Sequence, residues 1–293
     1  MRHRHIAGLI NVYEVSDPVE IKAVGDDPVI DRSFETSTCP VNWFLLKRSI
    51  NALSFRGRRF PTMEPRQCSS RARAQEQLWQ RLNEQIPDIK AGPVSLAPIA
   101  EWVKGSGRDD AVGILTQQLL GGLFRSDFTA TQETWAAALV LVKAPRSWNL
   151  PMLFWWLTTG KLKRAKAVLA GQVGGDLSAV NAIGIAVHNI VKGLHHMRAL
   201  YADTSTRTAL SPDAAAKQCL RAPVSIYRQS TADGTVLGIA FKKHSLFVLN
   251  IGVASQIDDG HSLVFMENSW SRCPAALWVP AMFEGVWRRA SEK

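Results

Sequence analysis

Residues 265–279 read F-M-E-N-S-W-S-R-C-P-A-A-L-W-V, and Cys273 lies at the centre of this stretch. Proline is favoured at the first position of a helix, because its missing N–H would have no partner there. We therefore expect a helix to begin at Pro274 and to leave Cys273 at its N-terminus, where free N–H groups and the helix dipole stabilise a thiolate. The pattern predicts a thiolate placed to be a ligand. The alternative is a buried cysteine that packs as a small apolar side chain.

This loop resembles the haem-binding loop of the cytochrome P450 family, in which the cysteine is the axial ligand of haem iron. The family loop runs Phe, two residues, Gly, one residue, His or Arg, one residue, Cys, one residue, Gly. In this chain Phe265 lies one residue early, and Ser269 and Ala275 stand at the two glycine positions. Ser271 stands where the basic residue is expected. The resemblance implies that Cys273 is the iron ligand of haem b.

Upstream of the loop, the apolar runs 236–241 and 246–251 predict two strands joined by a turn at residues 242–244, a β-hairpin. This segment resembles a sheet segment of the same family through Asn250, Gly252 and Ala254. Before it, Ser211 and Pro212 are typical of a helix start, and Pro223 ends the helix by residue 221.

The resemblance also gives roles to polar residues in this region. The family helix carries Glu-x-x-Arg, an internal ion pair, and here Gln218 and Arg221 occupy those positions, with Arg221 expected as a buried structural cation. Arg228 matches an arginine that binds a haem propionate. Further basic candidates for the propionates are Arg71, in a predicted helix over 66–86, and Arg272, beside the cysteine. For each arginine taken singly, a solvated surface charge is the alternative.

The composition favours one domain over residues 1–293 in a reducing cytosol. The chain is 46% hydrophobic and 20% charged, without a low-complexity linker. Its four cysteines lack the spacing of a zinc site or a disulfide framework. Asn11 and Glu14 interrupt the first apolar run too early for a signal peptide. The apolar run 152–157 is too short to span a membrane and is expected either in the core or as an interfacial anchor.

A net charge of +10 indicates an acidic partner. Nucleic acid is not expected, because the aromatic residues are not interleaved with the basic ones as a stacking platform requires. In the resembling family an acidic ferredoxin docks on the basic face over the cysteine. The candidate residues for that face are Arg66, Arg71, Arg73 and Arg272.

Apolar periodicity predicts helices over 97–103, 109–124 and 131–143 and a long helix over 176–202. By its order in the chain, the long helix corresponds to the family helix that crosses the haem and relays protons through an acidic residue and a threonine. Between Ala179 and His195 this chain has no Asp, Glu, Ser or Thr. His188 is the remaining candidate proton donor, and a structural histidine is its alternative role. Peroxide-driven oxidation is therefore an option beside dioxygen.

Together these features predict a compact cytochrome P450-like fold, mainly α with a small β-sheet. The function implied is that of a haem-thiolate oxidase or monooxygenase acting on a small hydrophobic molecule. The alternative is a non-catalytic protein of the same fold that binds haem weakly or not at all and acts as an interaction partner.

Overall fold

The computed structural model describes residues 1–6, 10–35, 50–51, 53–92, 95–144, 158–257 and 260–292. The contacts divide the chain into two compact units, each built from two separate stretches. Unit 1 comprises Met1–Gln75 with Ala222–Cys273, and unit 2 comprises Glu76–Arg221 with Pro274–Lys293. The single domain expected over residues 1–293 stays a prediction. The expected core or anchor segment 152–157 lies outside the described residues.

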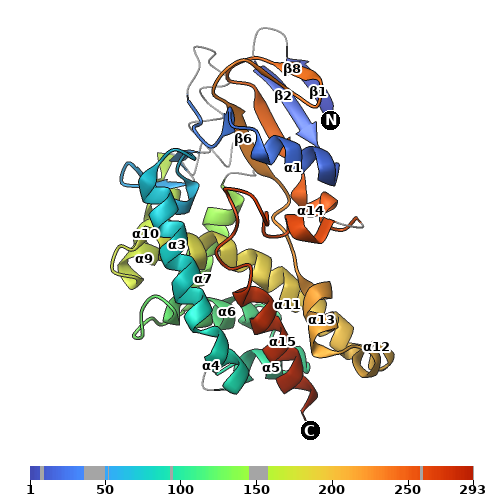
Figure 1. Ribbon diagram of the computed structural model, residues 1–293. Helices are drawn as coiled ribbons and strands as arrows, with labels where there is room; N and C mark the ends of the chain where they lie inside the picture. The colour runs from blue at the N-terminus through green and yellow to red at the C-terminus, as the bar shows by residue number, and fades with distance from the viewer. Residues whose placement is uncertain are drawn as a thin grey trace. The chain divides into compact units, whose positions relative to one another are not determined.

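Unit 1 contains a five-stranded sheet with the strand order β1-β2-β9-β6-β3, which joins N-terminal strands to strands near the C-terminus (Figure 1). The strands are β1 (Arg2–Ile6), β2 (Ile10–Val15), β3 (Ile30–Asp31), β6 (Ile226–Ser230) and β9 (Leu246–Leu249). Neighbours pair antiparallel, except for the parallel pair β2–β9. Because β9 is a central strand, β6 and β9 form one layer with the N-terminal strands β1 and β2.

The register of this sheet follows from the alternation of buried and half-buried side chains along β2 and β9. Tyr13 pairs with Phe247 and Val15 with Leu249, and all four side chains are buried. Successive residues of a strand point to opposite faces, so these four share one apolar face. Arg228 pairs with Phe247 from the neighbouring strand β6, and it is buried as well. The sheet therefore carries one arginine into the interior of unit 1.

Helix α1 (Pro18–Asp26) follows β2 directly, as the sequence predicts from Asp17 and Pro18. The Asp17 side chain accepts hydrogen bonds from the backbone N–H groups of Val19 and Glu20. An N-cap of this kind satisfies donors that have no partner within the helix. The buried side of α1 adds Ile21 and Val24 to the core cluster of unit 1.

The predicted hairpin between residues 236–241 and 246–251 is wrong in its pairing. Strand β7 (Gly234–Val236) pairs with β8 (Ile239–Phe241), so the first apolar run is itself a hairpin. Its turn residues Leu237 and Gly238 both have positive φ angles, 51° and 76°. Two left-handed residues match the turn type that suits the twist of a two-residue hairpin. The second run becomes β9 and pairs with β2 and β6 instead.

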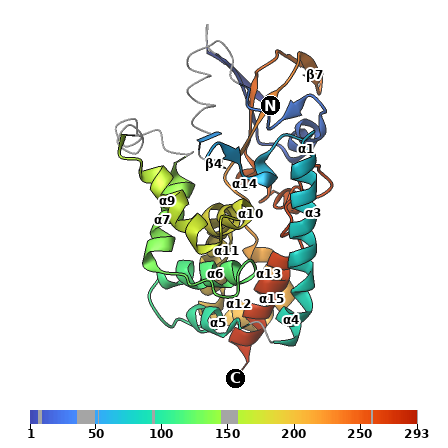
Figure 2. The same cartoon turned by 90° about the vertical axis from the view of Figure 1, so that its left-hand side faces the viewer.

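The described part of unit 2 is helical. Its elements are α4 (Ile86–Ala91), α5 (Ala97–Val103), α6 (Ala111–Gly122), α7 (Gln132–Lys143), α9 (Lys161–Gln172), α10 (Leu177–Asn181), the π-helix η2 (Ala182–Ala186), α11 (Val187–Ala202), α12 (Thr204–Ala209), α13 (Pro212–Cys219) and α15 (Trp278–Ser291). Helix α3 (Ser69–Glu84) crosses from unit 1 into unit 2. Helix α7 packs on α9, and α13 packs on α15 (Figure 2). The fold class, mainly α with a small sheet, is confirmed.

The long helix predicted over 176–202 is present, but one turn of it is a π-helix. Asp176 caps its start, and η2 interrupts the α-helical bonding at residues 182–186. The buried Gln117 donates to the backbone oxygen of Ile183 at 3.0 Å, which satisfies a carbonyl group within η2. Among the described residues, Leu177–Ala202 is the one helix long and apolar enough to cross a membrane, and 56% of its most apolar window is buried. Core helices of soluble proteins share these properties.

Candidate functional site

The Cys273 loop is closed by a hydrogen bond of 2.8 Å from the backbone N–H of Cys273 to the carbonyl oxygen of Phe265. The thiol is half-buried and forms no disulfide. The prediction of a helix from Pro274 is wrong by four residues, because residues 274–277 form turns and α15 begins at Trp278. A proline fits the first position of a turn as well as that of a helix, so the sequence did not distinguish the two.

Trp270, three residues before Cys273, lies at the centre of a group of arginines in unit 1. Its indole Nε1 donates to the backbone oxygen of Gly25 at 3.0 Å, which fixes the ring. Four guanidinium carbons lie 4.9–5.9 Å from the ring centroid, within the range of cation–π attraction. They belong to Arg32, Arg66, Arg71 and Arg228, here called the arginine cluster. Arg71 comes from α3 and Arg228 from β6, whereas Arg32 directly follows β3 and Arg66 precedes α3.

Arg228 enters this cluster from β6 and is 1% exposed. Its Nη2 donates to the hydroxyl of Ser271 at 2.9 Å, and its Nη1 donates to the carbonyl oxygen of Tyr227 at 2.9 Å. The Ser271 hydroxyl also lies 3.1 Å from the hydroxyl of Ser269. Arg228 therefore contacts the residue that stands at the basic position of the loop, two residues before Cys273.

Arg71 on α3 approaches the same loop from another side. Its Nη1 donates to the backbone oxygen of Trp270 at 3.0 Å and to Oε1 of Gln75 at 2.6 Å. Gln75 in turn donates to the backbone oxygen of Arg272 at 3.1 Å. Arg71 is 6% exposed. The expectation that Arg71 belongs to an exposed docking face is therefore wrong, whereas Arg73 is exposed on the same helix.

The cluster is short of negative charge. Asp31 is the only carboxylate counted as buried among the described residues. Its hydrogen bonds go to backbone N–H groups, at 2.6 Å from Arg32 and 2.9 Å from Arg66. One carboxylate therefore faces several guanidinium groups, and the surplus is positive.

Burial and mutual repulsion depress the pKa values of Arg32 and Arg228. The pKa of Arg32 is lowered to about 10, by desolvation first and by repulsion from Arg71 second. The pKa of Arg228 is lowered well below its usual value, again by desolvation first and by repulsion from Arg32 second. Asp31 opposes both shifts, and Cys273 opposes that of Arg32. The lowered pKa values mean that the charged guanidinium groups are poorly compensated in this site. Because arginines keep their protons at neutral pH, an added anion would stabilise them.

Two buried hydrogen-bond donors of the cluster also indicate a site for an anion. The Nε atoms of Arg71 and Arg228 are buried and have no protein partner in the described structure. Buried donors without a partner are costly, and a carboxylate is a strong acceptor for a guanidinium group. The two propionates of haem b would supply such acceptors, and the Cys273 thiol would supply the iron ligand. The residues of unit 1 therefore fit the group on charge and on donor chemistry.

Arg221 and Gln218 lie in unit 2 and differ from their expected roles. Arg221 is half-buried rather than buried, and its Nη1 donates to the backbone oxygens of Gln218 at 2.7 Å and of Leu220 at 2.8 Å. The Gln218 side chain is exposed. An amide offers no charge to a guanidinium group, so the arginine caps the C-terminal carbonyls of α13 instead.

His188 is 8% exposed in α11. Its Nε2 lies 3.0 Å from the backbone oxygen of Ala138, and its ring packs on Trp135 with centroids 4.9 Å apart. These contacts are those of a structural histidine, the alternative role considered for it. A role in proton delivery stays a prediction.

Sequence reasoning missed Asp31, Arg32 and Trp270. Asp31 and Arg32 directly follow the apolar residues Val29 and Ile30, far from the loop in sequence. Trp270 stands between two serines in the loop, and no signal in the sequence shows that distant arginines lie beside it. Among the described residues, no three His, Cys, Asp or Glu side chains gather as a metal site. A haem iron with one cysteine ligand does not require such a group.

Comparison with known protein families gives no matching family model, and no curated protein matches the sequence. Solved structures do match. CYP175A1 from Thermus thermophilus is similar with a TM-score of 0.62 and 13% identity, over 97% of this chain and 82% of that one. PksS, the cytochrome P450 of the bacillaene polyketide synthase of Bacillus subtilis, is similar with a TM-score of 0.61 and 11% identity, over 98% and 84% of the two chains.

A third similar structure is a variant of the cytochrome P450 OleT in complex with arachidonic acid, with a TM-score of 0.61 and 10% identity over 97% of this chain and 81% of that one. All three cover nearly the whole of this chain at low identity. The chain thus has the fold of the cytochrome P450s and is shorter than these examples.

Proposed function

Given a chain with the cytochrome P450 fold, we propose that it is a haem-thiolate protein that oxidises a small hydrophobic molecule. The observation that carries this is the arginine cluster with its unpartnered Nε atoms, which reaches Ser271, two residues from Cys273. The fold alone gives no function. A haem-thiolate protein needs cations for the haem propionates and a cysteine for the iron, and the arginine cluster and Cys273 would supply them.

Each residue has a stated task in this proposal. Cys273 would bind the iron through its thiolate, on a loop closed by the hydrogen bond from its N–H to the carbonyl oxygen of Phe265. Arg228 and Arg71 would hold the propionates through their buried Nε donors, which have no partner in the described structure. Ser271 orients Arg228, and Trp270 holds the guanidinium groups together. When bound, the haem supplies the oxidising chemistry. Arg272, whose backbone oxygen accepts from Gln75, is a further candidate on the loop.

The substrate of this protein would be hydrophobic, and its oxidant would be peroxide. A hydrophobic substrate agrees with the arachidonic acid bound by the structural neighbour OleT. Proton delivery typically contributes about two to four orders of magnitude to a step that needs it. Because residues 179–195 lack Asp, Glu, Ser and Thr, peroxide, which arrives already reduced, is the preferred oxidant. An acidic electron carrier of the ferredoxin type, acting in a cytoplasmic setting, is the partner if dioxygen is used.

The test is reconstitution of the purified chain with haemin. We expect a Soret band and, for the reduced protein under carbon monoxide, absorption at the position diagnostic of a thiolate ligand. Cys273→His should move that absorption, and Cys68→Ser, which changes a half-exposed cysteine in the same unit, should not. A wild-type chain that takes up no haem would instead favour the alternative, a P450-like interaction protein.

A further inference from the structure

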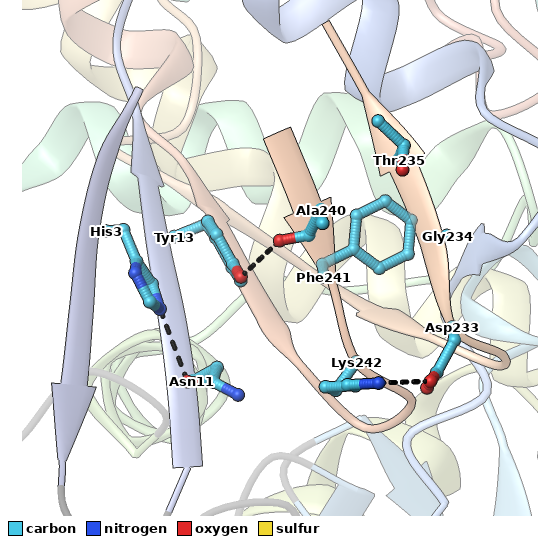
Figure 3. A pocket seen from close by; sticks show the side chains of 9 residues that line it. All are labelled: His3, Asn11, Tyr13, Asp233, Gly234, Thr235, Ala240, Phe241 and Lys242. Atoms are coloured by element: carbon cyan, nitrogen blue, oxygen red, sulfur yellow. Dashed lines mark hydrogen bonds and ion pairs between the residues drawn. The ribbon is translucent and has the colours of Figure 1, made fainter. Parts of the chain in front are cut away.

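A cavity of about 490 Å³ lies in unit 1 between the strands β1 and β2 and the hairpin β7–β8 (Figure 3). Small-molecule sites in proteins fall in this range of volumes. None of the residues that line it belongs to the arginine cluster or to the Cys273 loop. Its lining includes His3, Asn11, Tyr13, Asp233, Phe241 and Lys242. The proposed haem chemistry therefore gives this cavity no role.

One wall of the cavity is aromatic and rigid. Tyr13 is stacked between His3, with ring centroids 4.4 Å apart, and Phe247, with centroids 4.9 Å apart. Phe241 meets Phe247 edge to face at 5.3 Å. The phenol of Tyr13 donates to the backbone oxygen of Ala240 at 3.1 Å, so the wall joins the two pairs of strands. Because Tyr13 and Phe241 are both buried, their rings are held in place before any ligand arrives.

Gly234 is required for this wall. A Cβ atom at that position would lie 2.6 Å from Cζ of Phe241, which is closer than real Cβ contacts. The glycine thus lets the Phe241 ring lie directly against strand β7, as Figure 3 shows. Packing of this kind fixes a flat apolar surface rather than a flexible one.

The other end of the cavity carries an ion pair. Nζ of Lys242 lies 2.8 Å from Oδ2 of Asp233, and Oδ1 of Asp233 accepts from the backbone N–H of Lys243 at 2.8 Å. The side chains of Lys242 and Asp233 are 76% and 59% exposed. An exposed ion pair contributes at most about 1 kcal/mol, so a ligand can separate the two side chains at little cost.

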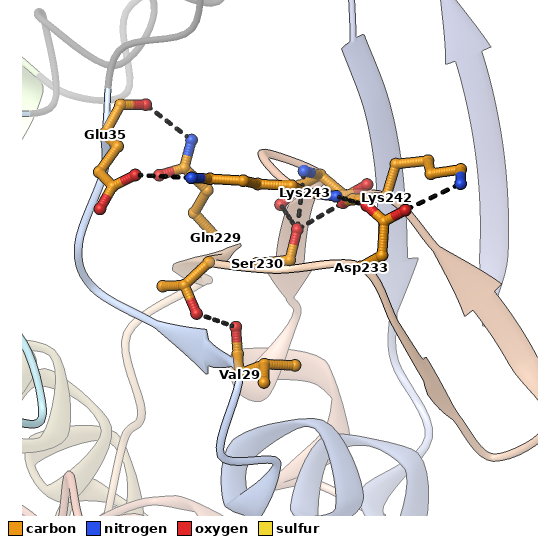
Figure 4. A network of polar contacts seen from close by, with 9 residues as sticks. Val29, Glu35, Gln229, Ser230, Asp233, Lys242 and Lys243 are labelled. Carbon is orange, nitrogen blue, oxygen red and sulfur yellow. Dashed lines mark hydrogen bonds and ion pairs between the residues drawn. The ribbon is translucent and has the colours of Figure 1, made fainter.

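The backbone that carries this ion pair is itself anchored. The hydroxyl of Ser230 donates to the carbonyl oxygen of Lys242 at 2.6 Å and accepts from the N–H of Ser245 at 2.9 Å (Figure 4). Ser230 is fully buried. The carboxylate of Asp233 is therefore fixed by the chain, and the long Lys242 side chain is the part free to move.

We propose that this cavity is a second small-molecule site, one that takes a zwitterionic aromatic ligand of the class of the aromatic amino acids. The ligand's ring packs against Phe241 and against the edge of Tyr13, whose two faces are covered by His3 and Phe247. Its ammonium group replaces Lys242 at Oδ2 of Asp233, and its carboxylate binds the displaced ammonium of Lys242. A ligand with only one charge would leave one member of the separated ion pair without a partner. The opposite charges at one end of an aromatic wall therefore select for a zwitterion.

The test is calorimetric titration of the purified chain with L-tryptophan. The variants Asp233→Asn and Lys242→Gln remove one charge each from exposed side chains, so the fold should be retained. Each should weaken binding by about two- to fivefold, up to the limit for an exposed charge pair. The matched controls are Asp213→Asn and Lys217→Gln, which alter an ion pair of 2.9 Å with similar exposure on α13 in unit 2. Both controls should bind as the wild type does.

Two analogues test the claim of a zwitterion. Tryptamine lacks the carboxylate and indolepropionate lacks the ammonium group, so both should bind about fivefold more weakly than tryptophan. Asp233→Asn should weaken tryptamine binding, and Lys242→Gln should not. The proposal is overturned by three outcomes: no saturable binding of tryptophan, equal binding of all three compounds, or equal losses in the controls. Addition of haemin should leave the result unchanged, so failure here is independent of the haem proposal.

Discussion

The guanidinium group of Arg228, 1% exposed, donates from Nη2 to the hydroxyl of Ser271 at 2.9 Å, while its Nε has no protein partner. A serine thus stands where the resembling loops carry a basic residue, and an arginine from strand β6 supplies the charge beside it. The positive charge next to the cysteine loop comes from distant parts of the chain. The contribution of this charge can therefore be tested by substituting Arg228 alone.

The first prediction concerns Arg228→Met, which keeps the length of the side chain and removes its charge. Removing a buried cation from a cluster with surplus positive charge should change the unfolding free energy of the haem-free protein by less than about 1 kcal/mol. The same change should weaken haem retention about tenfold or more, since a charge-assisted hydrogen bond to a propionate is lost. Urea denaturation and haem transfer to apomyoglobin measure the two effects.

The control for that variant is Arg108→Met, which changes an arginine whose side chain is 87% exposed in unit 2. It should leave both quantities unchanged. Equal haem retention in Arg228→Met and Arg108→Met would contradict the assignment of Arg228 to a propionate.

The second prediction concerns Gln117, whose side chain is fully buried. It donates to the carbonyl oxygens of Thr134 at 3.2 Å and of Ile183 at 3.0 Å, and it accepts from the Thr134 hydroxyl at 2.6 Å. Gln117→Leu removes these three hydrogen bonds, each with a net contribution of about 0.5–1.5 kcal/mol, although the Thr134 hydroxyl keeps its bond to the carbonyl oxygen of Thr131 at 2.9 Å. We expect urea denaturation to show a loss of about 2–4 kcal/mol. Gln118→Leu, at an exposed neighbouring position, should lose less than half of that.

The third prediction compares two adjacent glycines at the end of α6. A Cβ at Gly121 would lie 2.1 Å from the ring of Phe128, whereas a Cβ at Gly122 would have no neighbour within 4 Å. Gly121→Ala should therefore destabilise the protein by about 1–3 kcal/mol through overpacking. Gly122→Ala should stabilise it by about 0.4–1 kcal/mol, because alanine restricts the unfolded chain. Thermal unfolding of both variants measures this, and equal effects would count against the packing at Phe128.

The fourth prediction concerns pH. Burial raises the pKa of the Cys219 thiol to about 12 from its ordinary value of 9.0. Above about pH 9 the unfolded chain loses this proton and the folded chain keeps it, so the thiol's contribution to stability falls as pH rises from 9 to 12. Wild-type protein should therefore lose stability faster than Cys219→Ala over this range, by up to about 1.4 kcal/mol per pH unit. Parallel pH profiles from urea denaturation would contradict a buried, neutral Cys219.

The sequence by itself determined most of the local structure. Asp17, Asp176 and Ser211 accept hydrogen bonds from the N–H groups two or three residues ahead, and each caps the helix that begins after it. Caps and apolar periodicity act within one or two turns, so they can be read without knowledge of the fold. The mainly helical class and the resemblance through the Cys273 loop rest on the same short-range signals.

Only the tertiary structure decided which distant residues meet. Strand β9 pairs with β2 across more than two hundred residues, and no local signal distinguishes that partner from the adjacent run that was expected. The same long-range pairing brings Arg228 of β6, Asp31 of β3 and Trp270 of the loop together. Each arginine taken singly looks like a solvated charge in the sequence. Burial and mutual repulsion, which lower the pKa values of Arg32 and Arg228, exist only once the sheet is formed.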